Sequence, residues 1–146
     1  MKQEDKDLLI TYLSMALPYG VKLKKYNEDN SAVELYSINL EHETIQYWSY
    51  KGGSLQIGGY GHLIRHDKLQ FKPYLRPLSS MTEEEEKEFN EQMYKAKPYS
   101  DGKSYNVYEV IGLDIIYLNS HHFDYLGLIP KGLAIAITEE NNPYKK

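Results

Sequence analysis

Apolar side chains recur at helical spacing near the N-terminus and predict the first element of the chain. They stand at i, i+1, i+4, i+5, i+8 and i+9, one broad face of an α-helix, and are Leu8, Leu9, Tyr12, Leu13, Ala16 and Leu17. Asp5 is placed to cap the start of this helix, and Pro18 with Gly20 ends it. A helix this apolar on one side is expected to pack on a sheet.

The sheet is expected next, because apolar and polar residues alternate over residues 21–26, 33–40, 44–50 and 55–57. The outward side of the first of these strands is basic. Residues 51–54 have the chemistry of a hairpin turn, and the glycines within residues 58–61 are expected to break the last strand. The spacing predicts a small antiparallel meander, with a curled, barrel-like sheet as an option.

A proline-containing arm at residues 72–82 separates the sheet from the rest of the chain. Pro73 and Pro77 each fix their own φ, remove a backbone donor and hold the preceding residue extended. The arm is therefore predicted to be extended and to lie outside any helix or central strand. It carries Tyr74 and Leu75 as its large side chains.

Beyond the arm, Thr82 and Glu85 form the pattern of a capping box and predict a helix that runs to about Lys95. Residues 97–103 are expected to form an exposed loop, and residues 107–111 are ambiguous between strand and helix. Residues 113–121 indicate a short helix, and residues 133–137 a buried strand. The fold class is α+β over a single domain, residues 1–146. Residues 1–81 hold the helix and sheet, and residues 82–146 form a helical part that ends in a strand.

The amino-acid composition excludes some kinds of functional site and indicates where the protein is located. The chain lacks cysteine, which excludes a thiol nucleophile, disulfides and cysteine-based zinc sites. Its N-terminus is charged and no apolar run approaches the roughly 20 residues of a membrane span, so a cytoplasmic protein is expected. A net charge of −4 argues against broad nucleic-acid binding, although basic residues gather locally.

Histidines provide the candidates for catalysis and metal binding. His121 and His122 stand beside Asp124, a set that could act as an acid–base pair with its orienting carboxylate. A structural role for a buried, hydrogen-bonded histidine is the favoured interpretation, however. His62 and His66 are four residues apart, but on a strand that spacing separates them by roughly 13 Å, so no metal site is expected. No cofactor is expected either.

An aromatic and basic group is the main binding candidate. The chain has 15 tyrosines and only 3 phenylalanines, and tyrosine is common on recognition surfaces. Rings interleaved with cations on a sheet can hold single-stranded nucleic acid. The residues that offer this combination are Tyr47, Trp48, Tyr50, Tyr60, Arg65, Lys68 and Lys72. The alternative is that these rings simply cover a small core.

Several blocks of sequence resemble an uncharacterised bacterial family. They are the Leu-Pro-Tyr-Gly-Val stretch at residues 17–21, the arm with its acidic extension at residues 72–85, and residues 122–134, where His-Phe-Asp-Tyr precedes Gly-Leu-Ile and Lys-Gly-Leu-Ala. The resemblance implies a small cytoplasmic protein of gut anaerobes, associated with phage or mobile elements. It implies no catalytic residues.

Three functions stay open at this point. The first is a non-enzymatic module that binds another protein through the Tyr-rich sheet face or the arm. The second is a nucleic-acid-binding accessory protein that uses an aromatic and basic sheet face. The third is a small hydrolase. No nucleotide-binding loop or Gly-x-Ser-x-Gly elbow supports an enzyme.

Overall fold

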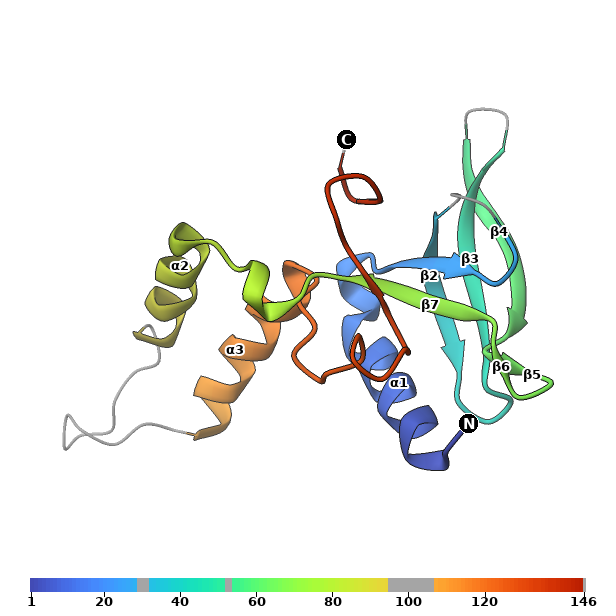
Figure 1. Ribbon diagram of the computed structural model, residues 1–146, viewed down its shortest axis with the longest axis horizontal. Helices are drawn as coiled ribbons and strands as arrows, with labels where there is room; N and C mark the ends of the chain where they lie inside the picture. The colour runs from blue at the N-terminus through green and yellow to red at the C-terminus, as the bar shows by residue number, and fades with distance from the viewer. Residues whose placement is uncertain (29–31, 52–53, 95–106, 146) are drawn as a thin grey trace.

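The computed structural model describes residues 1–28, 32–51, 54–94 and 107–145. The helices and strands, drawn in Figure 1, follow one another in the order α1 (Gln3–Ala16), β1 (Lys22–Lys25), β2 (Ala32–Asn39), β3 (Thr44–Lys51), β4 (Ser54–His62), β5 (Ile64–Arg65), β6 (Lys68–Leu69), β7 (Phe71–Leu75), α2 (Glu83–Tyr94), α3 (Val107–Ser120) and β8 (Ile135–Ala136). Short 3-10 turns at Leu17–Tyr19 and Leu78–Ser80 follow α1 and β7. The expected α+β fold is confirmed.

Six strands form one sheet in the order β4-β3-β2-β1-β7-β8, and β5 pairs with β6 in a separate two-stranded hairpin. Neighbouring strands are antiparallel except β7 and β8, which are parallel. The sheet does not close on itself, so the barrel-like option is wrong. The β7 strand enters between the first strand and the C-terminal one, which leaves β4 and β8 as open ends.

Helix α1 covers one face of the sheet and contributes its buried side to the core. Four of the residues expected on its apolar face are buried, namely Leu9, Tyr12, Leu13 and Ala16. They pack against side chains from the sheet that include Leu23, Leu35, Ile45 and Phe71. Asp5 does not cap the helix, which begins at Gln3 without a side-chain cap; its carboxylate instead accepts a hydrogen bond from Lys131 at 3.0 Å.

Strand β4 continues through the glycines that were expected to break it. The glycines allow core rings to lie against the strand backbone, because Tyr47 is the register partner of Gly59 and its ring would overlap a methyl group there. A Cβ at Gly61 would come within 3.1 Å of the Phe71 ring. These glycines make room for the core and do not end the strand.

The first part of the proline arm, residues 72–75, lies in the interior strand β7, contrary to expectation. Gln70 accepts a hydrogen bond from the amide of Tyr26, which follows the neighbouring strand β1, whereas Leu75 accepts one from Ile137 on the opposite side. Because the backbone polar groups of successive strand residues point to alternate sides, those of Pro73 point away from β1. Because pairing with β8 begins only at the next residue, Tyr74, the missing amide proton of Pro73 loses no ladder bond.

The capping box at the start of α2 is confirmed. The Thr82 hydroxyl accepts from the Glu85 amide at 3.1 Å, and the Glu85 carboxylate accepts from the Thr82 amide at 3.2 Å. The same carboxylate forms two hydrogen bonds with Arg76, at 2.6 and 2.7 Å. This pairing lowers the pKa of Glu85 to about 2. One residue thus caps α2 and ties it to the end of β7.

The C-terminal part differs from expectation in two places. The ambiguous residues 107–111 belong to a helix, α3, which lies beside α2 at the end of the molecule away from β4 (Figure 1). The expected strand at residues 133–137 shortens to the two residues Ile135–Ala136, which are only half-buried. The expected loop at residues 97–103 and the turn glycines at residues 52–53 lie outside the described residues.

Candidate functional site

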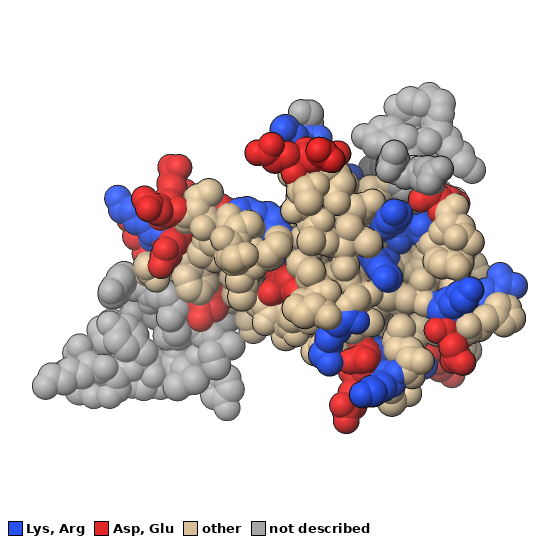
Figure 2. Space-filling view, viewed as in Figure 1, with Lys and Arg blue, Asp and Glu red and all other residues tan. Residues whose placement is uncertain are grey.

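The face of the sheet opposite α1 carries a group of cations and rings, and we call it the helix-free face. Cross-strand partners lie on the same side of a sheet, and the register pairs Lys24 with Lys72, and Glu34 with both Lys22 and Trp48. The intervening residues of these strands, such as Leu23, belong to the core under α1. Figure 2 shows blue side chains gathered over β1 and β7 on the side turned to the viewer.

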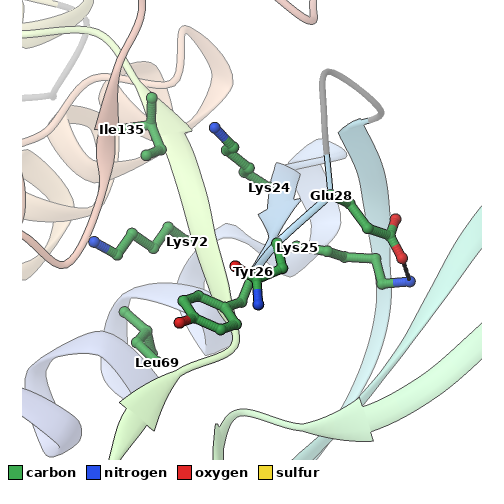
Figure 3. Close-up of a pocket in the computed structure, with 8 residues that line it drawn as sticks. Lys24, Lys25, Tyr26, Glu28, Leu69, Lys72 and Ile135 are labelled. Atoms are coloured by element: carbon green, nitrogen blue, oxygen red, sulfur yellow. Dashed lines mark hydrogen bonds and ion pairs between the residues drawn. The ribbon is translucent and has the colours of Figure 1, made fainter.

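A hollow of about 420 Å³ lies at the β1–β7 end of this face. Figure 3 shows Lys24, Tyr26 and Lys72 around it, with Leu69 below and Ile135 on the far side of β7. Lysine ammonium groups and a tyrosine ring thus border one space. We call it the lysine hollow.

Two of the lysines that line the hollow lie directly opposite each other. Lys24 and Lys72 are direct cross-strand partners, an arrangement that costs stability for like charges. Among the described residues neither lysine has an ion-pair partner. Glu28 and Lys25 also line the hollow, where the Glu28 carboxylate pairs with Lys25 on the side away from Lys72 (Figure 3). The pKa of Lys25 is raised by that hydrogen bond.

Tyrosine 26 links the lysine hollow to a further cation. Its side chain is 45% exposed, and the Lys68 ammonium lies 3.4 Å from its hydroxyl and 5.6 Å from the centre of its ring. Such cation–π contacts contribute about 0.5–1 kcal/mol at exposed sites. The ring is therefore held in place while leaving surface for a ligand.

Aromatic side chains continue the helix-free face beyond the lysines. Tyr36 on β2 meets Trp48 on β3 edge-to-face, with ring centres 4.6 Å apart, and 41% of the Tyr36 side chain is exposed. Strands in a sheet lie about 4.8 Å apart, so β1 and β3 are separated by about 10 Å. Rings and cations are close enough to contact one extended ligand.

The structure places the expected binding residues in different surroundings. Trp48 and Lys72 lie on the helix-free face, and Lys68 lies beside it. Tyr47 is buried in the core against Phe71 and does not reach that face. Tyr60, 65% exposed, lies at the far end of β4, and Arg65 is exposed on the separate hairpin; the side chain of Tyr50 lies outside the described residues.

Sequence reasoning missed Lys24, Tyr26 and Tyr36. The signal for the first two was present, since the alternation of residues 21–26 gave a strand with a basic outward side. Nothing in the local pattern showed that Lys72, almost fifty residues later, would be the partner of Lys24. The pairing of β1 with β7 creates the lysine hollow.

The histidine candidates have structural surroundings. His121 stacks on Tyr117 with ring centres 4.1 Å apart, and His122 stacks on Tyr144 at 3.7 Å. Both oxygens of Asp124 accept backbone N–H groups, from Leu128 and Ile129, each at 2.8 Å. The carboxylate therefore orients a turn of the main chain.

The other two candidate histidines, His62 and His66, lie at the hairpin end of the sheet. His62 ends β4, and His66 lies in the turn between β5 and β6 with a positive φ of 51°. Within the described residues, no group of three or more potential metal ligands occurs.

Acid should weaken the fold through His122. Burial, followed by the charges of His121, Arg76 and Lys22, lowers the pKa of His122 to about 4. The unfolded chain, with a histidine pKa of about 6.5, then binds the proton more readily. The free energy of unfolding should therefore be highest above about pH 6.5. It should fall by about 1–2 kcal/mol as the pH drops toward 4, because the side chain is half-buried. Urea melts at about pH 7 and pH 4.5 measure the difference.

A variant isolates the histidine contribution. His122 adopts a left-handed φ of 60°, which asparagine tolerates better than most residues, so His122→Asn removes the titrating group without changing the backbone requirement. The loss of stability between about pH 6.5 and 4.5 should shrink in this variant. An unchanged loss would assign the acid sensitivity to other groups. Glu85 contributes little to a loss in this pH range, because its pKa in the folded protein is about 2.

No helix in the described part of the chain is long and apolar enough to cross a membrane. Comparison with protein-family models, with curated proteins and with solved structures found no match for this chain. The resemblance to a bacterial family of mobile elements therefore stays a prediction.

Proposed function

We propose that this protein is a binding module that holds single-stranded nucleic acid on the helix-free face of its sheet. The observation that carries the proposal is the opposed pair Lys24 and Lys72, which lacks a counter-charge among the described residues. Two like charges side by side cost stability in the free protein. A bound phosphate would turn that cost into a favourable, charge-assisted contact.

The rings beside the lysines favour a single strand over a duplex. Base stacking on aromatic side chains contributes about 1–3 kcal/mol per base and requires bases that are not already paired within a helix. Tyr26 and Tyr36 expose 45% and 41% of their side chains on the face that carries the lysines. The net charge of −4 limits binding elsewhere on the surface, so a short, local site is expected.

Binding should depend on salt to the extent set by the two lysines. Fluorescence anisotropy with a labelled oligonucleotide would measure the dissociation constant over a range of salt. If Lys24 and Lys72 neutralise two phosphate charges, the logarithm of the binding constant falls with the logarithm of salt concentration with a slope of about −1.4. A duplex of the same sequence should bind more weakly, because its bases are not free to stack.

Charge-matched variants make the test specific. Lys24→Gln combined with Lys72→Gln should weaken binding by about tenfold or more and flatten the salt slope. Lys2→Gln combined with Lys87→Gln removes the same charge from exposed positions on α2 and before α1, and should change little. Equal losses in both double variants would reject the helix-free face as the site.

A protein partner at the same Tyr-rich face is the second candidate. Exposed tyrosines favour it, since Tyr36 and Tyr60 expose 41% and 65% of their side chains, and tyrosine is enriched in protein interfaces. A pull-down from a lysate of the native host, divided into nuclease-treated and untreated halves, separates the two. Proteins that survive nuclease treatment and are lost with Tyr36→Ala support the protein partner.

A further inference from the structure

The lysine hollow is closed on one side of the helix-free face. The sheet continues from the aromatic pair on β2 and β3 to the lysines on β1 and β7, and the next strand is β8. Ile135 of β8 lines the hollow, and the chain after it crosses the front of the molecule (Figure 1). A ligand that runs across the strands therefore meets a wall beyond Lys72.

The C-terminal segment also joins β1 to β7 through the side chain of Tyr144. The hydroxyl of Tyr144 accepts a hydrogen bond from the Lys22 amide at 2.8 Å and donates one to the Tyr74 carbonyl at 3.2 Å. By register, Lys22 and Tyr74 would be the next pair after Leu23 and Pro73. The C-terminal segment is thus anchored to the main chain of β1 and β7.

We propose, resting on the function above, that the lysine hollow binds the terminal phosphate of the strand. A phosphate inside a strand carries one negative charge, whereas a terminal phosphomonoester carries nearly two near neutral pH. The hollow offers Lys24 and Lys72, which have no ion-pair partner among the described residues, and these two cations match the charge of the terminal group. The wall at Ile135 stops the strand at the point where the lysines stand.

Tyr26 supplies the third contact of this end site. Its hydroxyl is within reach of Lys68, at 3.4 Å, and its exposed ring lies next to the lysine pair. The last base stacks on this ring while the phosphate is held by Lys24 and Lys72. The hollow, about 420 Å³ in volume, has room for a phosphate and part of its nucleotide.

The test compares strands that differ only at their ends. Three oligonucleotides of one sequence, roughly eight nucleotides long and labelled internally, carry a 5′-phosphate, a 3′-phosphate or hydroxyls at both ends. Anisotropy titrations should show that one phosphorylated strand binds about tenfold more tightly than the strand with free hydroxyls. The arm that gains affinity identifies which end enters the hollow.

Variants separate the end site from the rest of the face. Lys24→Gln and Lys72→Gln should each reduce the preference for the phosphorylated strand to near unity, with circular dichroism to verify the fold. Tyr36→Ala should lower the affinity for all three strands by a similar factor and leave the preference intact. Lys87→Gln, on the exposed side of α2, should change neither.

The two levels of the proposal fail in different ways. Equal affinity for the three strands would overturn the end site and leave the proposed function standing. Absence of binding to every strand would overturn both. A preference that persists in Lys24→Gln and in Lys72→Gln would overturn the assignment of the terminal phosphate to the lysine hollow.

Discussion

Replacing Leu75 with alanine is expected to lower the free energy of unfolding by about 2–5 kcal/mol. Its side chain is fully buried and belongs to the main core cluster. It lies on β7, an interior strand, and its carbonyl accepts the Ile137 amide at 2.8 Å. Alanine keeps that backbone bond but leaves a cavity between the sheet and its surroundings. Urea denaturation followed by circular dichroism measures the change.

A second leucine from the same stretch provides the control. Leu78 stands three residues later and exposes 48% of its side chain, so Leu78→Ala should change stability by less than about 0.5 kcal/mol. A loss below about 1 kcal/mol for Leu75→Ala would mean that β7 packs loosely and can leave the sheet. The comparison separates burial from any general effect of leucine loss near the prolines.

The elements that were predicted correctly are those with local causes. The apolar stripe of α1 and the capping box of Thr82 and Glu85 depend on residues within one or two turns of each other. Strands β1 to β3 likewise show their alternation in sequence. In each case the same residues that form the pattern also make the contacts.

The elements that were predicted wrongly depend on distant neighbours. Pro73 is tolerated in an interior strand because pairing with β8 begins one residue later, and no local pattern contains that register. The glycines of β4 are required by the rings of Tyr47 and Phe71, which come from other strands. The C-terminal strand is short because only Ile135 and Ala136 reach β7.

The candidate site was predicted in part for the same reason. Trp48 and Lys72 lie on the helix-free face, but Tyr47, their neighbour in sequence, faces the core. Adjacent residues on a strand point to opposite sides, so a cluster that is continuous in sequence is divided by the sheet. Lys24 becomes part of the site only through its partner across the strands.

Asp124, one of the catalytic candidates, makes contacts that hold the C-terminal part of the chain in place. Its own amide donates to the Arg76 carbonyl at 2.8 Å, while the Arg76 amide donates to the His122 carbonyl. Its carboxylate accepts the two amides at the start of the turn that brings Leu128, a fully buried residue, into the core. The main chain of Asp124 therefore pairs with the end of β7, while its side chain holds the turn that leads to β8.

Asp124→Ala is consequently expected to lower the free energy of unfolding by about 2–5 kcal/mol, because two N–H groups lose their acceptor and an unsatisfied buried group costs about 1–3 kcal/mol. Asp124→Asn keeps one acceptor oxygen and should lose less. In both variants the folded fraction should bind single-stranded nucleic acid as tightly as the native chain, since Asp124 lies outside the helix-free face. Native stability in Asp124→Ala combined with lost binding would reverse this assignment and return the carboxylate to a functional role.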